Sequence, residues 1–216
     1  MEESSKIPIL GYTKREDVRD VLVLPESGKP WEGRGVIGCS SFRRRIQGER
    51  LFPQAEFRSI RGNVLTRLEK LDRGEYDALI LAAAGLKRLG LEHRICRYFS
   101  AEEILPAAGQ GILAVQGRAG EDYGFLETLA KEGAGAEALA ERAFVRYLDG
   151  GCSSPVAAYA RVDNDRLYLR GLYYIEEKGS YTLGSREGRS EDAEEIGVLL
   201  AEEMERKYGR KGGAGA

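Results

Sequence analysis

Two arginine-rich turns, each between a predicted strand and a predicted helix, constrain this chain more than any other feature. Both lie in the stretch Val36–Arg67. The first follows a short apolar run and joins Ser40 and Ser41, either of which suits a helix N-cap, to Arg43–Arg45. Cations are disfavoured at a helix N-terminus, because its free N–H groups already carry partial positive charge. Arginines placed there indicate an anion-binding site.

The second turn, Arg58–Asn63, has the same arrangement, with Asn63 as the predicted cap of the next helix. A third basic turn, Ala84–Arg88, follows a predicted buried strand. Ligands of open α/β sheets bind beyond the carboxyl ends of the strands, so these turns should share one edge. A lone arginine run is more often a solvated surface. The repetition favours a cleft for a ligand with several carboxylates or phosphates.

Strands and helices alternate through the first half of the chain, which predicts a parallel, right-handed, doubly wound sheet in an α/β domain. Two short strands precede this alternation. The predicted strands are 7–12, 21–24, 35–39, 56–60 and 77–83, and the predicted helices are 41–51, 63–71 and 85–91.

The second half of the chain has a different pattern. Three alternating runs separated by turns, at 156–162, 167–175 and 181–187, predict an antiparallel meander. Helices are predicted at 121–132, 137–148 and 190–208, the second with Ala140, Phe144 and Tyr147 or Leu148 inward. The fold prediction is therefore an α/β domain followed by a small α+β domain with a three-stranded antiparallel sheet.

Composition excludes several classes of protein. No apolar run approaches the length that spans a membrane. The formal net charge of −2 and the absence of aromatic residues between the arginines argue against nucleic-acid binding. The three cysteines, Cys39, Cys96 and Cys152, are widely spaced without a metal-ligand pattern, which favours a reduced, cytoplasmic setting and no metal.

Four motifs, in this order, resemble those of porphobilinogen deaminase, also called hydroxymethylbilane synthase: GCSSFRRR, FRSIRGNVLTRLEKLDRGEYDALILAAAGLKRLG, LPAAGQG and GGCSSPVAAYA. The resemblance runs from about Lys14 to about Tyr208. It implies an enzyme of tetrapyrrole (haem) biosynthesis that joins four porphobilinogen units head to tail and releases ammonia at each addition. It also implies a first domain like one lobe of a type II solute-binding protein.

The resemblance sets the expected domain limits. Residues 1–103 would be the family's second domain, which binds anions. Residues 104–119 would be a segment that returns to the first domain, and residues 120–216 would be the third domain, to which the cofactor is attached.

The family's dipyrromethane cofactor is bound through a cysteine thioether, and GGCSSP implies attachment at Cys152. A thiolate beside a Gly-Gly turn is accessible and can add to an electrophilic carbon. Without the resemblance, a buried cysteine that acts as a small hydrophobe would be the better interpretation. Cys39 and Cys96 are expected to be structural.

Each pyrrole carries an acetate and a propionate, so the cofactor brings four carboxylates, which suit the planar fork of arginine better than lysine. Arg45 matches no family role and is expected on the surface. The cofactor-binding residues that the motifs imply are Ser40, Ser41, Arg43, Arg44 and Arg67. Those implied for the substrate or growing polypyrrole are Arg61, Gly62, Arg88 and Gln110.

In the family, roughly a further half-domain precedes the segment that matches KREDVRD, and this preceding half-domain carries the catalytic aspartate. Asp17 and Asp20 match a different place, so no catalytic residue is identified here. We expect the carboxyl-terminal part of a synthase that is inactive alone, either one part of a split enzyme, with a separate chain supplying the missing portion, or a truncated form of a longer chain. Ile112–Val115 would then be an apolar strand without neighbours, and Ile104–Arg118 would be disordered or buried against another chain.

A rival interpretation from another class is a non-catalytic module that binds polycarboxylates without reaction. A covalent dipyrromethane would favour the deaminase, and an unmodified chain would leave the binding module open.

Overall fold

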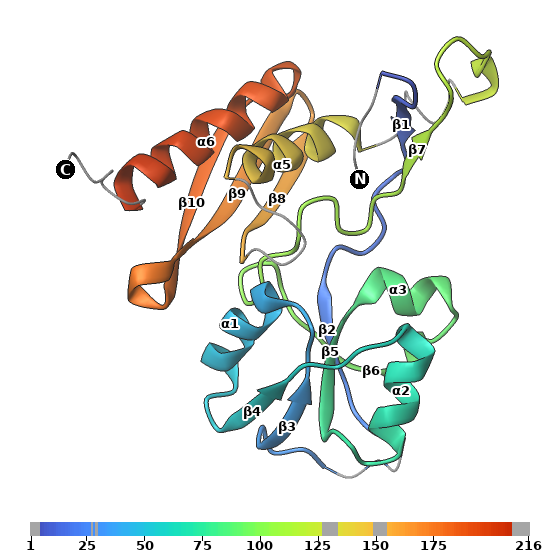
Figure 1. Cartoon of the computed structure of the whole chain (residues 1–216), viewed down its shortest axis with the longest axis vertical. Coiled ribbons are helices and arrows are strands. Elements are labelled where there is room, and N and C mark those ends of the chain that lie inside the picture. The colour runs from blue at the N-terminus through green and yellow to red at the C-terminus, as the bar shows by residue number, and fades with distance from the viewer. Residues whose placement is uncertain (1–4, 27, 29, 127–133, 149–154, 209–216) are drawn as a thin grey trace.

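The computed structural model of the chain describes residues 5–26, 28, 30–126, 134–148 and 155–208. Its strands form sheets of five, three and two strands (Figure 1). The five-stranded sheet and the three-stranded sheet each carry their own helices, as the alternation in the first half and the meander in the second half predict.

The five-stranded sheet has the order β4-β3-β5-β2-β6. Its strands are β2 (Asp20–Val23), β3 (Gly35–Gly38), β4 (Ala55–Arg58), β5 (Ala78–Ala82) and β6 (Ile95–Tyr98). β3 is parallel to β4 and β5, as predicted, but β2 is antiparallel to both β5 and β6. The prediction of a parallel sheet is wrong for β2. The chain enters β2 at the edge where β5 ends, with Asp20 opposite Ala82, and therefore runs the opposite way.

Helices cover both faces of this sheet. They are α1 (Phe42–Leu51), α2 (Val64–Asp72) and α3 (Ala83–Arg88). Side chains of β5 alternate between the two cores. Leu79 and Leu81 pack with buried residues of α2 and α3, while Ala78 and Ile80 pack in the core on the other face, together with Phe52 that follows α1.

Local signals set the helix ends. The Ser41 side chain accepts a hydrogen bond from Arg44 N, and the Asn63 side chain accepts one from Thr66 N, as the cap predictions required. Gly74 follows α2 with φ of 80°, the left-handed conformation that favours glycine beyond a helix end.

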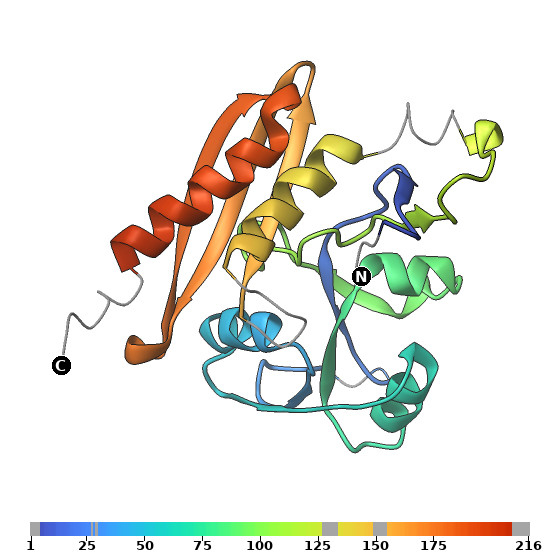
Figure 2. The ribbon, with the colours of Figure 1, turned by 45° about the horizontal axis from the view of Figure 1, so that its top comes forward.

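The three-stranded sheet is an antiparallel meander of β8 (Ala157–Asp163), β9 (Arg166–Ile175) and β10 (Ser180–Arg189), as predicted. Two helices, α5 (Gly135–Tyr147) and α6 (Ala193–Tyr208), lie side by side over one face (Figure 2). They approach closely, since a Cβ at Gly197 would lie 2.3 Å from Ala140 O.

Some predictions about the second half need correction. Of the two alternatives at the end of α5, Leu148 packs against the core with Ala140 and Phe144, whereas Tyr147 is 39% exposed. The helix predicted to begin at Ser190 begins at Ala193, because Ser190–Asp192 form a 3₁₀ turn ahead of it. Most of the helix predicted at 121–132 lies outside the described residues. The 3₁₀ turns are Glu92–Arg94, Gly124–Leu126, Glu176–Lys178 and Ser190–Asp192.

A two-stranded antiparallel ribbon pairs the segment before the five-stranded sheet with the segment after it. β1 (Ile9–Tyr12) pairs antiparallel with β7 (Ala114–Gln116), with Gly11 opposite Val115. The prediction that this apolar strand lacks neighbours is therefore wrong, because β1 supplies one. Ile104–Arg118 is also ordered, and Ile104 and Leu105 are buried in the cores of the chain.

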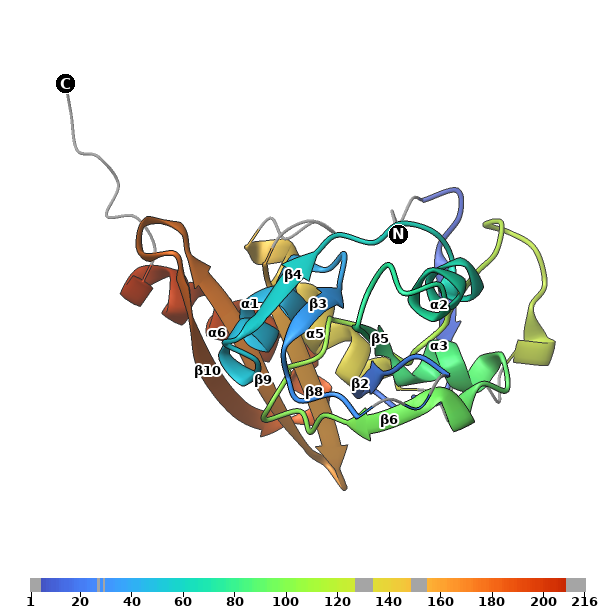
Figure 3. The same cartoon turned by 90° about the horizontal axis from the view of Figure 1, so that it is seen from below.

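The α/β unit contacts the three-stranded sheet through α1, as the view from below shows (Figure 3). The rings of Phe42 in α1 and Tyr174 in β9 lie 5.3 Å apart in an edge-to-face arrangement. Among the helices that the structure describes, none has the length and apolar character needed to cross a membrane.

Candidate functional site

The three basic turns come together at the edge where the parallel strands β3, β4 and β5 end, as the sequence predicts. The Ser40 hydroxyl donates to Ile60 O, which ties the turn after β3 to the turn after β4. Gly85 in α3 approaches the Val64 side chain at the start of α2. We call four residues of these turns the arginine edge: Arg44, Arg61, Arg67 and Arg88.

A buried carboxylate forms ion pairs with two arginines on the inner side of the arginine edge. Asp20 is 0% exposed and is bonded to Arg43 Nη1 at 2.7 Å and to Arg44 Nε at 2.8 Å. Gln110 Nε2 donates to the same carboxylate at 3.0 Å. Burial opposes the ionisation of Asp20, but the charges of Arg43 and Arg44 outweigh it and lower its pKa. Asp20 therefore remains charged and sets the direction of both guanidiniums.

Arg43 lies inside the protein. Its Nη1 also donates to Leu105 O at 2.6 Å, and its Nη2 donates to Gln110 Oε1 at 3.3 Å. Arg43 thus joins α1 to the segment after β6, in addition to any contact with a ligand. Arg44 is less buried and has its Nη2 at 3.4 Å from the same Gln110 oxygen. The implied role of these two arginines in binding cofactor carboxylates stays a prediction.

The other members of the arginine edge are not in ion pairs with any described residue. Arg67 Nε donates to Gly62 O at 2.8 Å, and Arg88 Nη2 lies 3.4 Å from Gly111 O. Burial and the neighbouring charge of Arg44 lower the pKa of Arg67, so the two cations lie within electrostatic range of one another. Arg61 is exposed. These cations are placed together without carboxylate partners.

Surface arginines nearby contrast with this edge. Arg45 is paired with Glu49 at 2.7 Å, and Arg58 is paired with Glu56 at 2.6 Å. The expectation that Arg45 lies on the surface agrees with its exposed position.

Gly62 is needed for the second turn. Its φ is 118°, and a Cβ there would lie 2.8 Å from Thr66 Cγ2. Only glycine adopts this backbone without strain, and in this conformation the exposed Gly62 offers its C=O to Arg67.

Gln110 lies where two connecting segments cross. Gly111 has φ of 84°, and a Cβ there would meet Glu16 O at 2.5 Å, so the segments 13–19 and 106–113 touch backbone to backbone. Gln110 Nε2 donates to Val18 O at 2.6 Å. Its predicted role in binding substrate stays a prediction; the structure places its side chain on Asp20 and the arginines.

A second buried carboxylate, Glu141 of α5, anchors this crossing. It is bonded to Arg15 Nη2 at 2.7 Å, accepts from Gly109 N at 2.6 Å and accepts from Ala160 N at 2.6 Å. Burial raises its pKa to about 7, against the charge of Arg15 and the two backbone donors. Glu141 links the three-stranded unit to the segment that carries Gln110.

Sequence reasoning did not identify Asp20 or Glu141. A signal for Asp20 was present, since a carboxylate immediately before the apolar run Val21–Leu24 should pair if the strand is buried. Glu141 gave no comparable signal, because its position in an amphipathic helix is separated from its partner Arg15 by 126 residues.

Two of the three cysteines lie among the residues that the structure describes. Cys152 lies outside the described residues, so its attachment role stays a prediction. Cys39 is buried, and burial raises the pKa of its thiol; Cys96 is exposed.

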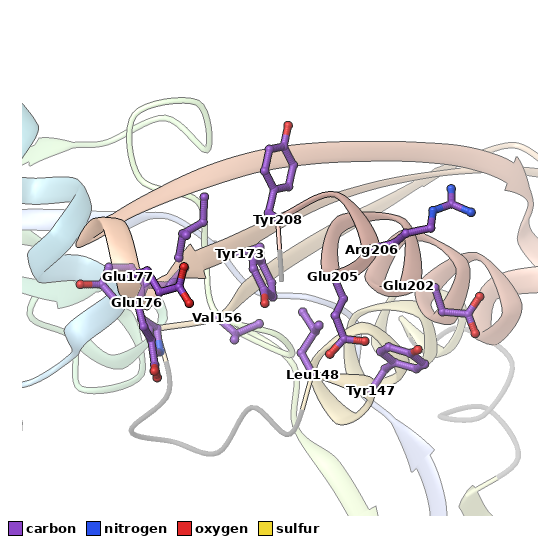
Figure 4. A pocket seen from close by; sticks show the side chains of 13 residues that line it. Tyr147, Leu148, Val156, Tyr173, Glu176, Glu177, Glu202, Glu205, Arg206 and Tyr208 are labelled. Carbon is purple, nitrogen blue, oxygen red and sulfur yellow. The ribbon is translucent and has the colours of Figure 1, made fainter. Parts of the chain in front are cut away.

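A hollow of about 690 Å³ lies beside α5, α6 and β9 (Figure 4). It has the opposite character to the arginine edge, since Glu202 and Glu205 line it with tyrosines. Burial and these two carboxylates raise the pKa of Tyr147. This hollow would repel carboxylate ligands, so the arginine edge is the better anion site.

Comparison with known proteins shows which family the chain resembles. The model "Porphobilinogen deaminase, dipyromethane cofactor binding domain" matches residues 1–124, and the model "Porphobilinogen deaminase, C-terminal domain" matches residues 136–206. The porphobilinogen deaminase of Ruminiclostridium cellulolyticum is 50% identical over 205 residues, which cover 95% of this chain and 70% of the relative. That of Alkaliphilus oremlandii is 52% identical over 198 residues, which cover 92% and 67%.

These matches bear on the expected extent of the chain. The first family model matches from residue 1, so it does not support the expectation that most of the first domain is missing. The relatives are longer than the region that matches this chain. The porphobilinogen deaminase of Acetivibrio thermocellus, for example, is 48% identical, and the match covers 70% of its length. The predicted domain limits at 103 and 119 stay predictions.

Proposed function

Since the chain belongs to the porphobilinogen deaminase family, we propose that it takes part in joining porphobilinogen units head to tail, with release of ammonia, in tetrapyrrole biosynthesis. Residues 1–124 match the family's dipyrromethane cofactor binding domain. The observation that carries the proposal is the arginine edge, where three of four guanidiniums are in no ion pair with a described residue.

The donors at this edge fit a ligand with several carboxylates. Guanidiniums bind planar carboxylates in a bidentate manner. Arg44 and Arg67 lie close enough for their charges to interact and would hold the cofactor's carboxylates, with the hydroxyls of Ser40 and Ser41 beside them. When bound, the cofactor supplies the anchored pyrroles to which further units are joined. Cys152 would carry the thioether.

The remaining members would serve the incoming substrate and the growing chain. Arg61 is exposed and lies beside the accessible backbone of Gly62, while Arg88 and Gln110 lie toward the crossing of the connecting segments. Arg43 would act from behind, since its guanidinium fills the space between Asp20 and Leu105 O.

We propose that the acid–base group of the reaction is not one of the two aspartates near this edge. Asp20 is fully buried and engaged by Arg43 and Arg44. Asp17 is bonded to Arg19 and lies 3.4 Å from Lys87 Nζ, and the hydrogen bond from Arg19 is the main cause that lowers its pKa to about 2. A group with such a low pKa is a poor general base near neutral pH.

The β1–β7 ribbon supports the related proposal that further strands complete the enzyme. A ribbon of two strands is marginal by itself, and open edges accept additional strands. Leu113 next to β7 is 50% exposed and Ile7 next to β1 is 48% exposed. A polypeptide segment that pairs with this ribbon would cover them and could bring the catalytic aspartate. In that case the 216-residue chain alone would not turn over porphobilinogen.

Mass spectrometry tests the function most directly. The chain is produced with preformed tetrapyrrole, and its intact mass and peptides are measured. We expect a dipyrromethane on Cys152, retained in Cys39→Ser and Cys96→Ser and lost in Cys152→Ser. An adduct on Cys39 or Cys96 would contradict the assignment.

A turnover assay separates the remaining possibilities. Ammonia release by the chain alone, at a rate of about 1 per second or more, would show that it supplies its own acid–base group. A chain that binds pyrrole carboxylates but gains no adduct under any condition would instead be a non-catalytic module, as the likeness of its first domain to a type II solute-binding lobe would allow.

A further inference from the structure

A cavity of about 700 Å³ lies between the connecting segment 15–19 and the three-stranded sheet. Its walls come from residues 15–19, from residues 100–102 after β6, and from β8 and β9. No member of the arginine edge lines it. Its volume lies in the range of small-molecule sites. This cavity is therefore a separate candidate binding site.

Tyrosines and arginines alternate on the wall that β8 and β9 provide. Ala158 and Ala160 point into the core under α5 and α6, so Tyr159 and Arg161 point to the opposite face. On β9, Tyr168 and Arg170 do the same.

The strand register places a tyrosine opposite an arginine in both cross-strand pairs. Tyr159 is opposite Arg170, and Arg161 is opposite Tyr168. The two arginines are thus diagonal neighbours, which in antiparallel sheets lie about 7–8 Å apart. The Arg161 guanidinium lies over the Tyr168 ring, with its carbon 5.6 Å from the ring centre. The Arg15 guanidinium lies likewise over the Tyr159 ring, with its carbon 5.5 Å from the ring centre, so each tyrosine has a cation over one face.

The cations of this cavity are only partly neutralised. Arg161 is in no ion pair with a described residue. Arg170 is bonded to Glu102 at 3.1 Å, but Glu102 is 74% exposed, so the pair is weak and replaceable. Arg15 at the inner end is bonded to Glu141, yet its Nε is buried without a hydrogen-bond partner among the described residues. Three carboxylates, those of Glu16, Asp17 and Glu102, also line the cavity, but each is already paired: Glu16 with Lys87, Asp17 with Arg19 and Lys87, and Glu102 with Arg170. Arg161 is therefore the lining cation without a carboxylate partner among the described residues.

We propose that this cavity binds a small planar ring that carries two carboxylates. Arg161 and Arg170 would each bind one carboxylate, and the rings of Tyr159 and Tyr168 would contact the faces of the ligand. Porphobilinogen, a pyrrole with an acetate and a propionate, is a molecule of this class that the proposed function brings to the chain. Only this choice of natural ligand rests on the proposed function.

Phthalate, a benzene ring with two adjacent carboxylates, is the first probe. Amide chemical shifts of the isotope-labelled chain are followed by NMR during a phthalate titration. We expect saturable shifts on β8 and β9, and an affinity at least tenfold lower in Arg161→Gln/Arg170→Gln. Tyr168→Leu should also weaken binding, while retaining both charges.

The control variant is Arg166→Gln, which removes an exposed arginine of β9 that is paired with Glu187 and does not line the cavity. It should bind phthalate like the unmodified chain. Acetate at equal ionic strength should produce no saturable shifts. Equal binding by all variants, shifts confined to the arginine edge, or acetate binding as tight as phthalate would each overturn the proposal.

A second titration uses porphobilinogen with Arg61→Ala/Arg67→Ala, which removes two cations of the arginine edge. Saturable shifts on β8 and β9 that persist in this variant would support porphobilinogen as the ligand. Phthalate binding without porphobilinogen binding would exclude that natural ligand. Neither result depends on cofactor attachment or turnover, so a failure here is distinct from a failure of the proposed function.

Discussion

Replacing Glu141 by glutamine should remove a pH dependence of folding stability. Glu141 has a pKa raised from 4.5 to about 7, mainly by burial. Between these pH values the folded chain keeps a proton that the unfolded chain releases. The free energy of unfolding therefore falls as the pH rises through this window and levels off above it. The shift of about 2.5 units corresponds to about 3 kcal/mol.

Glutamine has the shape of glutamate but does not ionise. Its oxygen can accept from Gly109 N or Ala160 N, while its NH₂ group must face the other donor, to which protonated Glu141 still offers an oxygen. The variant should therefore be less stable at low pH, by roughly 1–3 kcal/mol. Because the variant lacks the titration, its disadvantage should shrink as the pH rises.

The assay is urea unfolding of both proteins at several pH values from 4 to 8. The quantity to compare is the difference in unfolding free energy between them, since all other titrating groups cancel. It should change by about 3 kcal/mol in favour of Glu141→Gln across this range. Glu203→Gln, which removes an exposed partner of Arg186, should alter stability by less than about 1 kcal/mol at every pH. A Glu141→Gln difference that is constant with pH would refute the reasoning.

Three further predictions concern the arginine edge. Asp20→Asn should cost roughly 3–5 kcal/mol in chemical unfolding, because it leaves the buried guanidinium of Arg43 and the partly buried one of Arg44 without their carboxylate partner. Since the pKa of Asp20 is lowered, its stabilisation should be present at neutral pH and lost as the pH falls through that pKa. Arg67→Ala should reduce cofactor retention, measured by intact mass, at least tenfold more than Arg45→Ala, with little change in Tm for either. Gly62→Ala should lower stability by about 1–3 kcal/mol, because its φ of 118° and the nearby Thr66 methyl exclude a Cβ, and an unchanged Tm would contradict this.

Much of the fold follows from short-range patterns. The caps at Ser41 and Asn63 and the alternating strands of the meander were all predicted at or near their observed positions. Such signals act between residues a few positions apart, so periodicity and side-chain type are sufficient to find them.

The location of the candidate site was also accessible to prediction. Arginines that follow parallel strands must share an edge, since the strands end there together. The direction of β2 was not predictable in this way, because its short apolar run is compatible with either orientation.

The roles of individual charges at the site depended on contacts between distant segments. Arg43 and Arg44 are consecutive residues of one helix, yet Arg43 is buried and Arg44 lines the arginine edge. Asp20, Leu105 and Gln110 make this difference, and they lie 23 to 67 residues from Arg43. Desolvation and pairing of a charge are set by everything that surrounds it in space, and no local pattern in the sequence encodes those surroundings.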